Sequence, residues 1–185
     1  MNDYNSLTYA QLIQIADCII QGEPITSPQR GIDNFVFTYF GKVVAKERAR
    51  GEHFYTPKAT RDFEADVKDK AYRYMRTEGY HQTFAFPMQA RIEIHTEMPE
   101  DWPQWKKTLA VNNMLLPTKQ DTDNKVKAIQ DGMNKVVYRD DKQIFDIRAR
   151  QVYRRADMFT FKFEPIGLTK LEVDRLAKIM KAKGA

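Results

Sequence analysis

The 185-residue chain is 42% apolar and 30% charged, a balance that excludes both a disordered protein and a membrane-embedded one. Its 30 basic residues outnumber its 25 acidic residues, and the resulting net charge of +5 favours polyanionic partners such as nucleic acid. The length fits a single domain with appendages.

The sequence gives no indication of a membrane span, a signal peptide, a disulfide or a zinc site. We expect no transmembrane helix, because every apolar run is much shorter than the ~18 residues that a span requires, and the first residues do not form a signal peptide. Cys18 is the only cysteine, which excludes an intrachain disulfide and fits a cytoplasmic protein. The three histidines lie far apart in the sequence, so we expect no zinc site.

The first 30 residues predict an appendage. Apolar residues recur at helical spacing over residues 7–21, Gly22 follows as a stop signal, and prolines then mark a linker. We expect residues 1–30 to form a helical extension that packs on the core in preference to binding a partner. Residues 31–185 then form the main domain.

A basic segment follows the first predicted strand, residues 35–40. Between Lys42 and Arg61 there are six basic residues and two acids, interleaved with aromatic side chains. Cations of this kind bind phosphates and aromatic rings stack on exposed bases, although a solvated turn can have the same composition. We favour DNA contact and predict that five residues contribute to it: Lys46, Arg48, Arg50, Tyr55 and Lys58.

The middle of the chain predicts one helix, one strand and one insertion. Thr56 can cap a helix that starts at Pro57 and continues to Gly79, and residues 88–98 alternate as a half-buried strand does. The insertion, residues 99–118, predicts a loop or short helix. We expect its tryptophans to anchor it to the core slightly more readily than to stack on DNA.

The C-terminal part predicts two strands and a helix. Residues 144–153 and 158–163 alternate and are close in sequence, which indicates an antiparallel hairpin. The last helix begins with a capping box of Thr169 and Glu172. We expect three apolar residues of this helix to face inward: Val173, Leu176 and Met180.

The acidic block before and within the helix predicted at residues 124–134 indicates a metal site. Asp121 and Asp123 precede this helix, and side chains two apart in an extended segment point the same way, so both can bind one cation. Lys127 and Asp131 continue from Asp123 at four-residue spacing and form one stripe on the helix. Carboxylates of this kind are the ligands that Mg²⁺ prefers.

The block continues beyond the helix with Asp140 and Asp141, where a following strand can bring a third carboxylate back. Each acid has an ordinary structural alternative: Asp123 as a helix cap, Lys127 and Asp131 as a surface pair, and Asp140 with Asp141 as turn residues. We favour the metal site because the alternatives require several independent coincidences.

The order of these residues resembles the core pattern of the RusA family of Holliday junction resolvases, which are phage and prophage endonucleases. Their pattern, Asp-x-Asp-Asn-x-x-Lys, then Asp, then Asp-Asp-x-Gln, is matched here by Asp121, Asp123, Asn124, Lys127, Asp131, Asp140, Asp141 and Gln143. The resemblance covers about residues 35–163. It implies Mg²⁺, or Mn²⁺ in its place, on Asp121, Asp123 and Asp141, with Lys127 as the essential cation. Asn124, Asp131 and Asp140 would support them.

The resemblance also implies a fold and a function. We expect an α+β domain with helices packed on a mixed sheet, resolving four-way DNA junctions by paired nicking in recombination and repair. We further expect a homodimer without membrane contact, in the cytoplasm of a bacterial host or a phage-infected cell. The alternative is a non-catalytic phage protein that binds DNA or junctions with the same fold. Carboxylates that repel phosphates argue against it.

Overall fold

The computed structural model describes residues 4–32, 35–46, 56–118 and 121–185. A four-stranded mixed sheet with the order β1-β4-β2-β3 forms its centre, and β2 pairs parallel with β3 and antiparallel with β4. The elements in chain order are α1 (Tyr9–Gln21), β1 (Val36–Phe40), α2 (Lys58–Thr77), β2 (Met88–Glu97), α3 (Gln104–Val111), α4 (Thr122–Met133), η1 (Asp141–Gln143), β3 (Ile144–Arg154), β4 (Met158–Pro165) and α5 (Lys170–Ala182).

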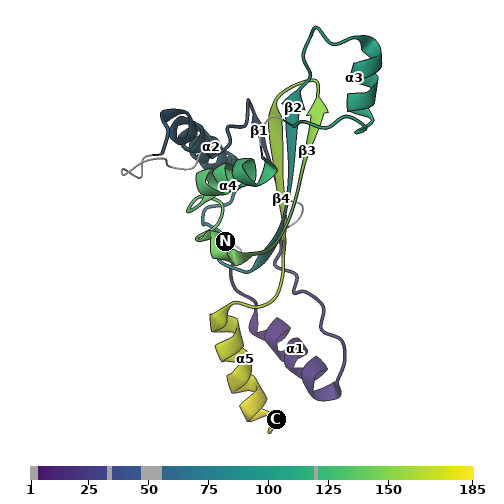
Figure 1. Ribbon diagram of the computed structural model, residues 1–185. Helices are drawn as coiled ribbons and strands as arrows, with labels where there is room; N and C mark the ends of the chain where they lie inside the picture. Colours follow the sequence, from purple (N-terminus) through teal and green to yellow (C-terminus); the bar gives the residue numbers. More distant parts are fainter. Residues whose placement is uncertain (1–3, 33–34, 47–55, 119–120) are drawn as a thin grey trace, which may run out of the picture.

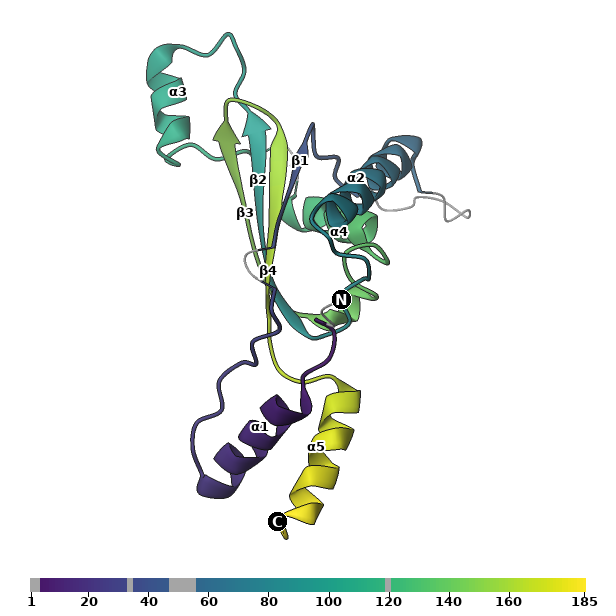
Figure 2. The ribbon, with the colours of Figure 1, turned by 180° about the vertical axis from the view of Figure 1, so that it is seen from behind.

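Helices α2 and α4 cover one face of the sheet and bury the main core beneath them (Figures 1 and 2). The inward residues of β2 and β4 alternate with exposed ones, as the sequence predicts, and Phe159, Phe161 and Phe163 are buried. The opposite face has no helix in the described part of the chain and carries ion pairs such as Arg91 with Glu164. The expected α+β class with a mixed sheet is confirmed.

The predicted hairpin between the third and fourth strands is wrong. β3 and β4 are consecutive in the chain, but β2 lies between them and pairs with both. A three-residue connection can span the roughly 10 Å between next-nearest strands of a sheet, so a short link does not require pairing. The inserted β2 is buried on its inward side along most of its length, which favours a central position.

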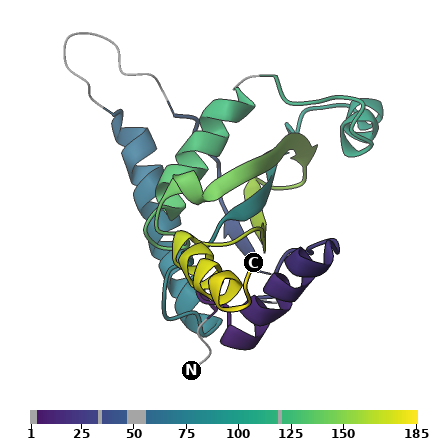
Figure 3. The same ribbon diagram turned by 90° about the horizontal axis from the view of Figure 1, so that it is seen from below.

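Helices α1 and α5 form a unit of their own beyond one end of the sheet (Figures 1 and 3). Leu12, Ala16 and Leu176 belong to an apolar cluster that is separate from the main core. The expected capping box of α5 is present, but Val173 is 48% exposed, so its predicted inward position is wrong. Leu176 is buried and Met180 is partly buried against the same cluster, as predicted, and Ile179 is buried there too.

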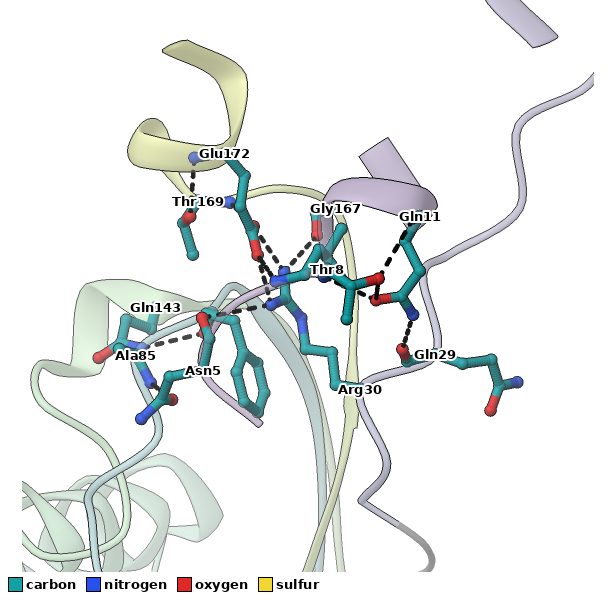
Figure 4. Close-up of polar contacts among 12 residues, drawn as sticks. Asn5, Thr8, Gln11, Gln29, Arg30, Ala85, Gln143, Gly167, Thr169 and Glu172 are labelled. Carbon is teal, nitrogen blue, oxygen red and sulfur yellow. Dashed lines mark hydrogen bonds and ion pairs between the residues drawn. The ribbon is translucent and has the colours of Figure 1, made fainter. Parts of the chain in front are cut away.

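A buried ion pair connects this two-helix unit to the rest of the chain (Figure 4). Arg30 donates through both terminal nitrogens to the two carboxylate oxygens of Glu172, each at 2.8 Å, and both side chains are 1% exposed or less. Glu172 also accepts hydrogen bonds from the backbone amides of Leu7 and Thr169 at 2.7 Å. The Arg30 guanidinium lies 4.9 Å from the centre of the Phe86 ring, in the main domain.

Among the residues that the structure describes, no helix is both long and apolar enough to span a bilayer.

Candidate metal and DNA-binding site

The N-terminal end of α4 presents two exposed carboxylates. Asp121 occupies the N-cap position and Asp123 lies in the first turn, and neither has an ion-pair partner within the described residues. Asn124 donates a long hydrogen bond of 3.4 Å to Asp121 Oδ2. The positive end of the helix dipole favours negative charge at this position.

The local backbone differs from the sequence-based prediction at Asp123. The helix begins at Thr122, two residues before the predicted start, so Asp123 is helical and not part of an extended segment. The alternative role of Asp123 as the N-cap is also wrong, because Asp121 occupies that position without making a side-chain cap. Both carboxylates nevertheless lie within one helical turn of each other.

Close packing between α4 and α2, near the C-terminal end of α4, holds this helix in place. A Cβ atom at Gly132 would lie 2.9 Å from Val67 Cβ, so only glycine allows this approach of the two helices. Tyr138 adds a second anchor, since its hydroxyl donates to the Gln130 carbonyl oxygen at 2.8 Å. The helix that presents Asp121, Asp123 and the exposed Lys127 is therefore rigidly mounted.

The second acidic pair lies in the turn before β3. Asp140 caps η1, where its carboxylate accepts from the Lys142 amide at 3.0 Å, and this hydrogen bond lowers its pKa. Gln143 donates to the carbonyl oxygens of Phe84 and Phe86 at 3.2 and 3.0 Å, which fastens the turn to the segment just before β2. Asp140 and Gln143 thus have structural roles, and Asp141 is left exposed.

The structure does not bring Asp141 to Asp121 and Asp123 within one chain. Asp141 follows the C-terminal end of α4, a helix about 18 Å long, whereas the other two acids lie at its N-terminal end. Within residues 4–32, 35–46, 56–118 and 121–185, no three His, Cys, Asp or Glu side chains form a group able to hold a metal. The pair at the start of α4 still suits Mg²⁺, which commonly takes one or two carboxylates and completes its shell with water and phosphate oxygens.

Asp131 pairs with a basic residue other than Lys127. The Lys46 ammonium group forms an ion pair with Asp131 and lies 3.8 Å from Glu64. The hydrogen bond to Asp131 raises the pKa of Lys46, and burial raises the pKa of Glu64. Lys46 therefore joins α2 to α4, a role that its position in a basic segment does not reveal.

The other predicted DNA contacts are only partly described. Arg48, Arg50 and Tyr55 lie outside the described residues. Lys58 is exposed at the start of α2 and forms an ion pair with Asp62 at 2.5 Å. The Lys46 amide donates to the Asn124 carbonyl oxygen at 3.0 Å, so the basic segment approaches the first turn of α4, beside the acidic pair.

Sequence reasoning missed two buried polar residues near the start of α4. Lys125 is 5% exposed and Gln151 is 9% exposed, and both line a cavity of about 710 Å³. Burial lowers the pKa of Lys125, an effect that Lys42 reinforces and Asp157 opposes. The sequence offered a weak signal, because Lys125 lies on the buried side of the helical repeat, next to Val126.

The fold and this acidic helix agree with those of an endodeoxyribonuclease family, which sequence similarity identifies. A model of the family described as "Endodeoxyribonuclease RusA" matches residues 22–158, so the chain belongs to the RusA endodeoxyribonuclease family. A relative from Bacillus subtilis (strain 168), "Uncharacterized protein YqaN", is 30% identical over 131 residues, which cover 66% of this chain and 89% of the relative.

Proposed function

We propose that this protein is a Mg²⁺-dependent, structure-selective endodeoxyribonuclease that resolves four-way DNA junctions by paired nicking in recombination and repair. Family membership supports an endonuclease acting on DNA. One observation carries the proposal of a Mg²⁺-dependent nuclease. Asp121 and Asp123 are exposed, have no ion-pair partner within the described residues, and lie on a firmly packed helix beside the start of a basic segment.

Each side chain of this end of α4 has a role in the proposal. Asp121 and Asp123 would hold Mg²⁺ or Mn²⁺, and the metal would activate a water molecule and stabilise charge on the phosphate. Lys127 is exposed one turn after Asp123, and its ammonium group offsets negative charge on the reacting phosphate. The cations between Lys42 and Arg61 bind the DNA backbone.

The proposed homodimer forms along β3. This strand is an edge of the described sheet, and its residues Phe145 and Ile147 are 72% and 39% exposed. An unpaired edge with exposed apolar side chains is suited to pairing with a second copy. Closed dimers are most often two-fold symmetric, and such pairing of identical edges is antiparallel.

A two-fold dimer of this kind would bring Asp141 of one subunit toward Asp121 and Asp123 of the other. Antiparallel pairing places the start of β3, where Asp141 lies, beside the end of the partner's β3. The end of β3 is close to the start of α4, because Gln151 and Lys125 line the same cavity. We therefore propose that Asp141 of the partner subunit completes the metal site of Asp121 and Asp123.

Mixed dimers test the completion of the site across the subunit boundary. A dimer with Asp121→Asn in one subunit and Asp141→Asn in the other retains one intact set of three carboxylates in the proposed arrangement. We expect it to nick one strand of a junction, although both parent homodimers are inactive. Equal inactivity of the mixed dimer and its parents would place all three acids in one subunit, whereas an active Asp141→Asn homodimer would remove Asp141 from the site.

A nicking assay on defined substrates tests the function itself. We expect nicks in opposing strands of a synthetic four-way junction in Mg²⁺, at least tenfold faster than in a linear duplex of the same sequence, and no nicks in EDTA. Binding of the junction without nicking in Mg²⁺ or Mn²⁺ would instead show the non-catalytic alternative.

A further inference from the structure

We infer that the cavity beside the start of α4 receives a single unstacked base of the DNA substrate. The cavity has a volume of about 710 Å³, within the usual range for small-molecule sites. This inference rests on the proposed function, because it names the part of the DNA that the protein binds next to the reacting phosphate.

The walls of the cavity are suited to a flat aromatic ligand. Trp102 and Tyr153 form one side, with ring centres 4.9 Å apart and planes at 69°. The Lys106 ammonium group lies 4.1 Å from the centre of the Trp102 ring and fixes it further. Aromatic side chains with an apolar surround are what proteins use to hold bases removed from the stack.

Two polar residues, Gln151 and Lys125, line this space, and one of them has a buried atom without a partner. Gln151 donates from Nε2 to Thr96 Oγ1 at 3.1 Å, but its Oε1 atom is buried without a hydrogen-bond partner in the described residues. The Lys125 ammonium group likewise has no acceptor among them. A buried polar atom without a partner is costly, so a ligand that donates to Gln151 Oε1 and accepts from the Lys125 ammonium group would be favoured.

This combination favours a base over a phosphate. A phosphodiester has no donor for Gln151 Oε1, whereas every nucleobase presents an N–H group next to an acceptor. The charged lining is also mixed, because Glu97 and Asp157 offset part of the positive charge. The phosphates of the same strand are then left for the exposed end of α4, one turn away from Lys125.

Junctions with one unpaired base test this inference in the full-length protein. We would compare a four-way junction carrying a single unpaired base at the branch with the same junction carrying an abasic residue there, by fluorescence anisotropy in Ca²⁺. We expect the base to tighten binding about tenfold, as one stacked base does. Trp102→Ala and Gln151→Leu should each reduce this ratio below about threefold and leave affinity for the abasic junction unchanged.

Trp105 provides the matched control, because it lies three residues after Trp102 at the start of α3 but is 65% exposed and does not line the cavity. Trp105→Ala should keep the tenfold ratio. Photocrosslinking of 5-iodouracil at the unpaired position gives a readout independent of any variant, and the crosslinked peptide should contain Trp102 or Tyr153.

The outcomes distinguish failure of the base-binding site from failure of the proposed nuclease function. Equal affinity for the two junctions, or crosslinks only to peptides outside the cavity, would overturn the base-binding site and leave the nuclease proposal intact. Failure to bind either junction would overturn both the base-binding site and the proposed junction nuclease.

Discussion

Asp121→Asn and Asp123→Asn should each reduce junction nicking about a thousandfold or more, and leave junction binding unchanged or tighter. Each substitution removes one charge from the proposed metal site, and loss of several kcal/mol of transition-state stabilisation has an effect of this size. The amide also removes repulsion toward DNA phosphates, which explains the preserved affinity. We expect Asp141→Asn to behave in the same way, and Lys127→Ala to lose turnover and some affinity.

Asp140→Asn is the matched control for these variants. Asparagine can still accept the hydrogen bond from the Lys142 amide, so the cap of η1 survives while one nearby charge is removed. We also expect a smaller loss from Asp131→Asn, whose carboxylate pairs with Lys46. Nicking by Asp121→Asn and Asp123→Asn at near wild-type rates would leave Asp121 only as a helix cap position.

Arg30→Met should lower the free energy of unfolding by about 3–5 kcal/mol, because it leaves the Glu172 carboxylate buried without its charge partner. The loss should appear first in the unit of α1 and α5, which this ion pair joins to the main domain. Urea unfolding followed by circular dichroism measures it. Replacing both residues by Met should cost much less than the single substitution.

Acid should reproduce part of this effect in the wild-type protein. Burial alone would raise the pKa of Glu172, but the hydrogen bonds from Arg30 and from the amides of Thr169 and Leu7 outweigh it and lower the pKa to about 2. A carboxylate with a depressed pKa in the folded state stabilises the protein above its unfolded pKa of 4.5. We therefore expect stability to fall as the pH drops from about 4.5 to about 2.

The ion pair of Lys183 with Asp17 is a control in the same two-helix unit. It joins α5 to α1 at 2.6 Å, but both side chains are at least one-third exposed. Lys183→Met should therefore cost less than about 1 kcal/mol. If Arg30→Met costs no more than Lys183→Met, the buried ion pair does not hold the unit to the domain.

Several parts of this fold could be predicted from local sequence signals. The two-residue alternation of β2 and β4 and the capping box of Thr169 and Glu172 depend on neighbours in the chain, and the structure has them. The acidic helix was also predictable within two residues, because Val126, Ile129 and Met133 recur at helical spacing. Such features need no knowledge of distant contacts.

Features that depend on distant partners were not predictable in the same way. Alternation shows that a segment is a strand but does not identify its neighbour, so the insertion of β2 between β3 and β4 was missed. Glu172 was correctly placed in a capping box, but its bond to Arg30 joins residues 142 positions apart. Lys46 likewise belongs to a basic segment in the sequence and to an ion pair with Asp131 in the structure.

Mn²⁺ binding measured by electron paramagnetic resonance tests most directly whether Asp121 and Asp123 form a metal site, because Mn²⁺ that binds the protein no longer contributes to the signal of the free ion. We expect the wild-type protein and Asp140→Asn to bind Mn²⁺, and the double variant Asp121→Asn/Asp123→Asn to lose that binding while remaining folded by circular dichroism. Retention of wild-type Mn²⁺ binding by the double variant would contradict a metal site at the start of α4.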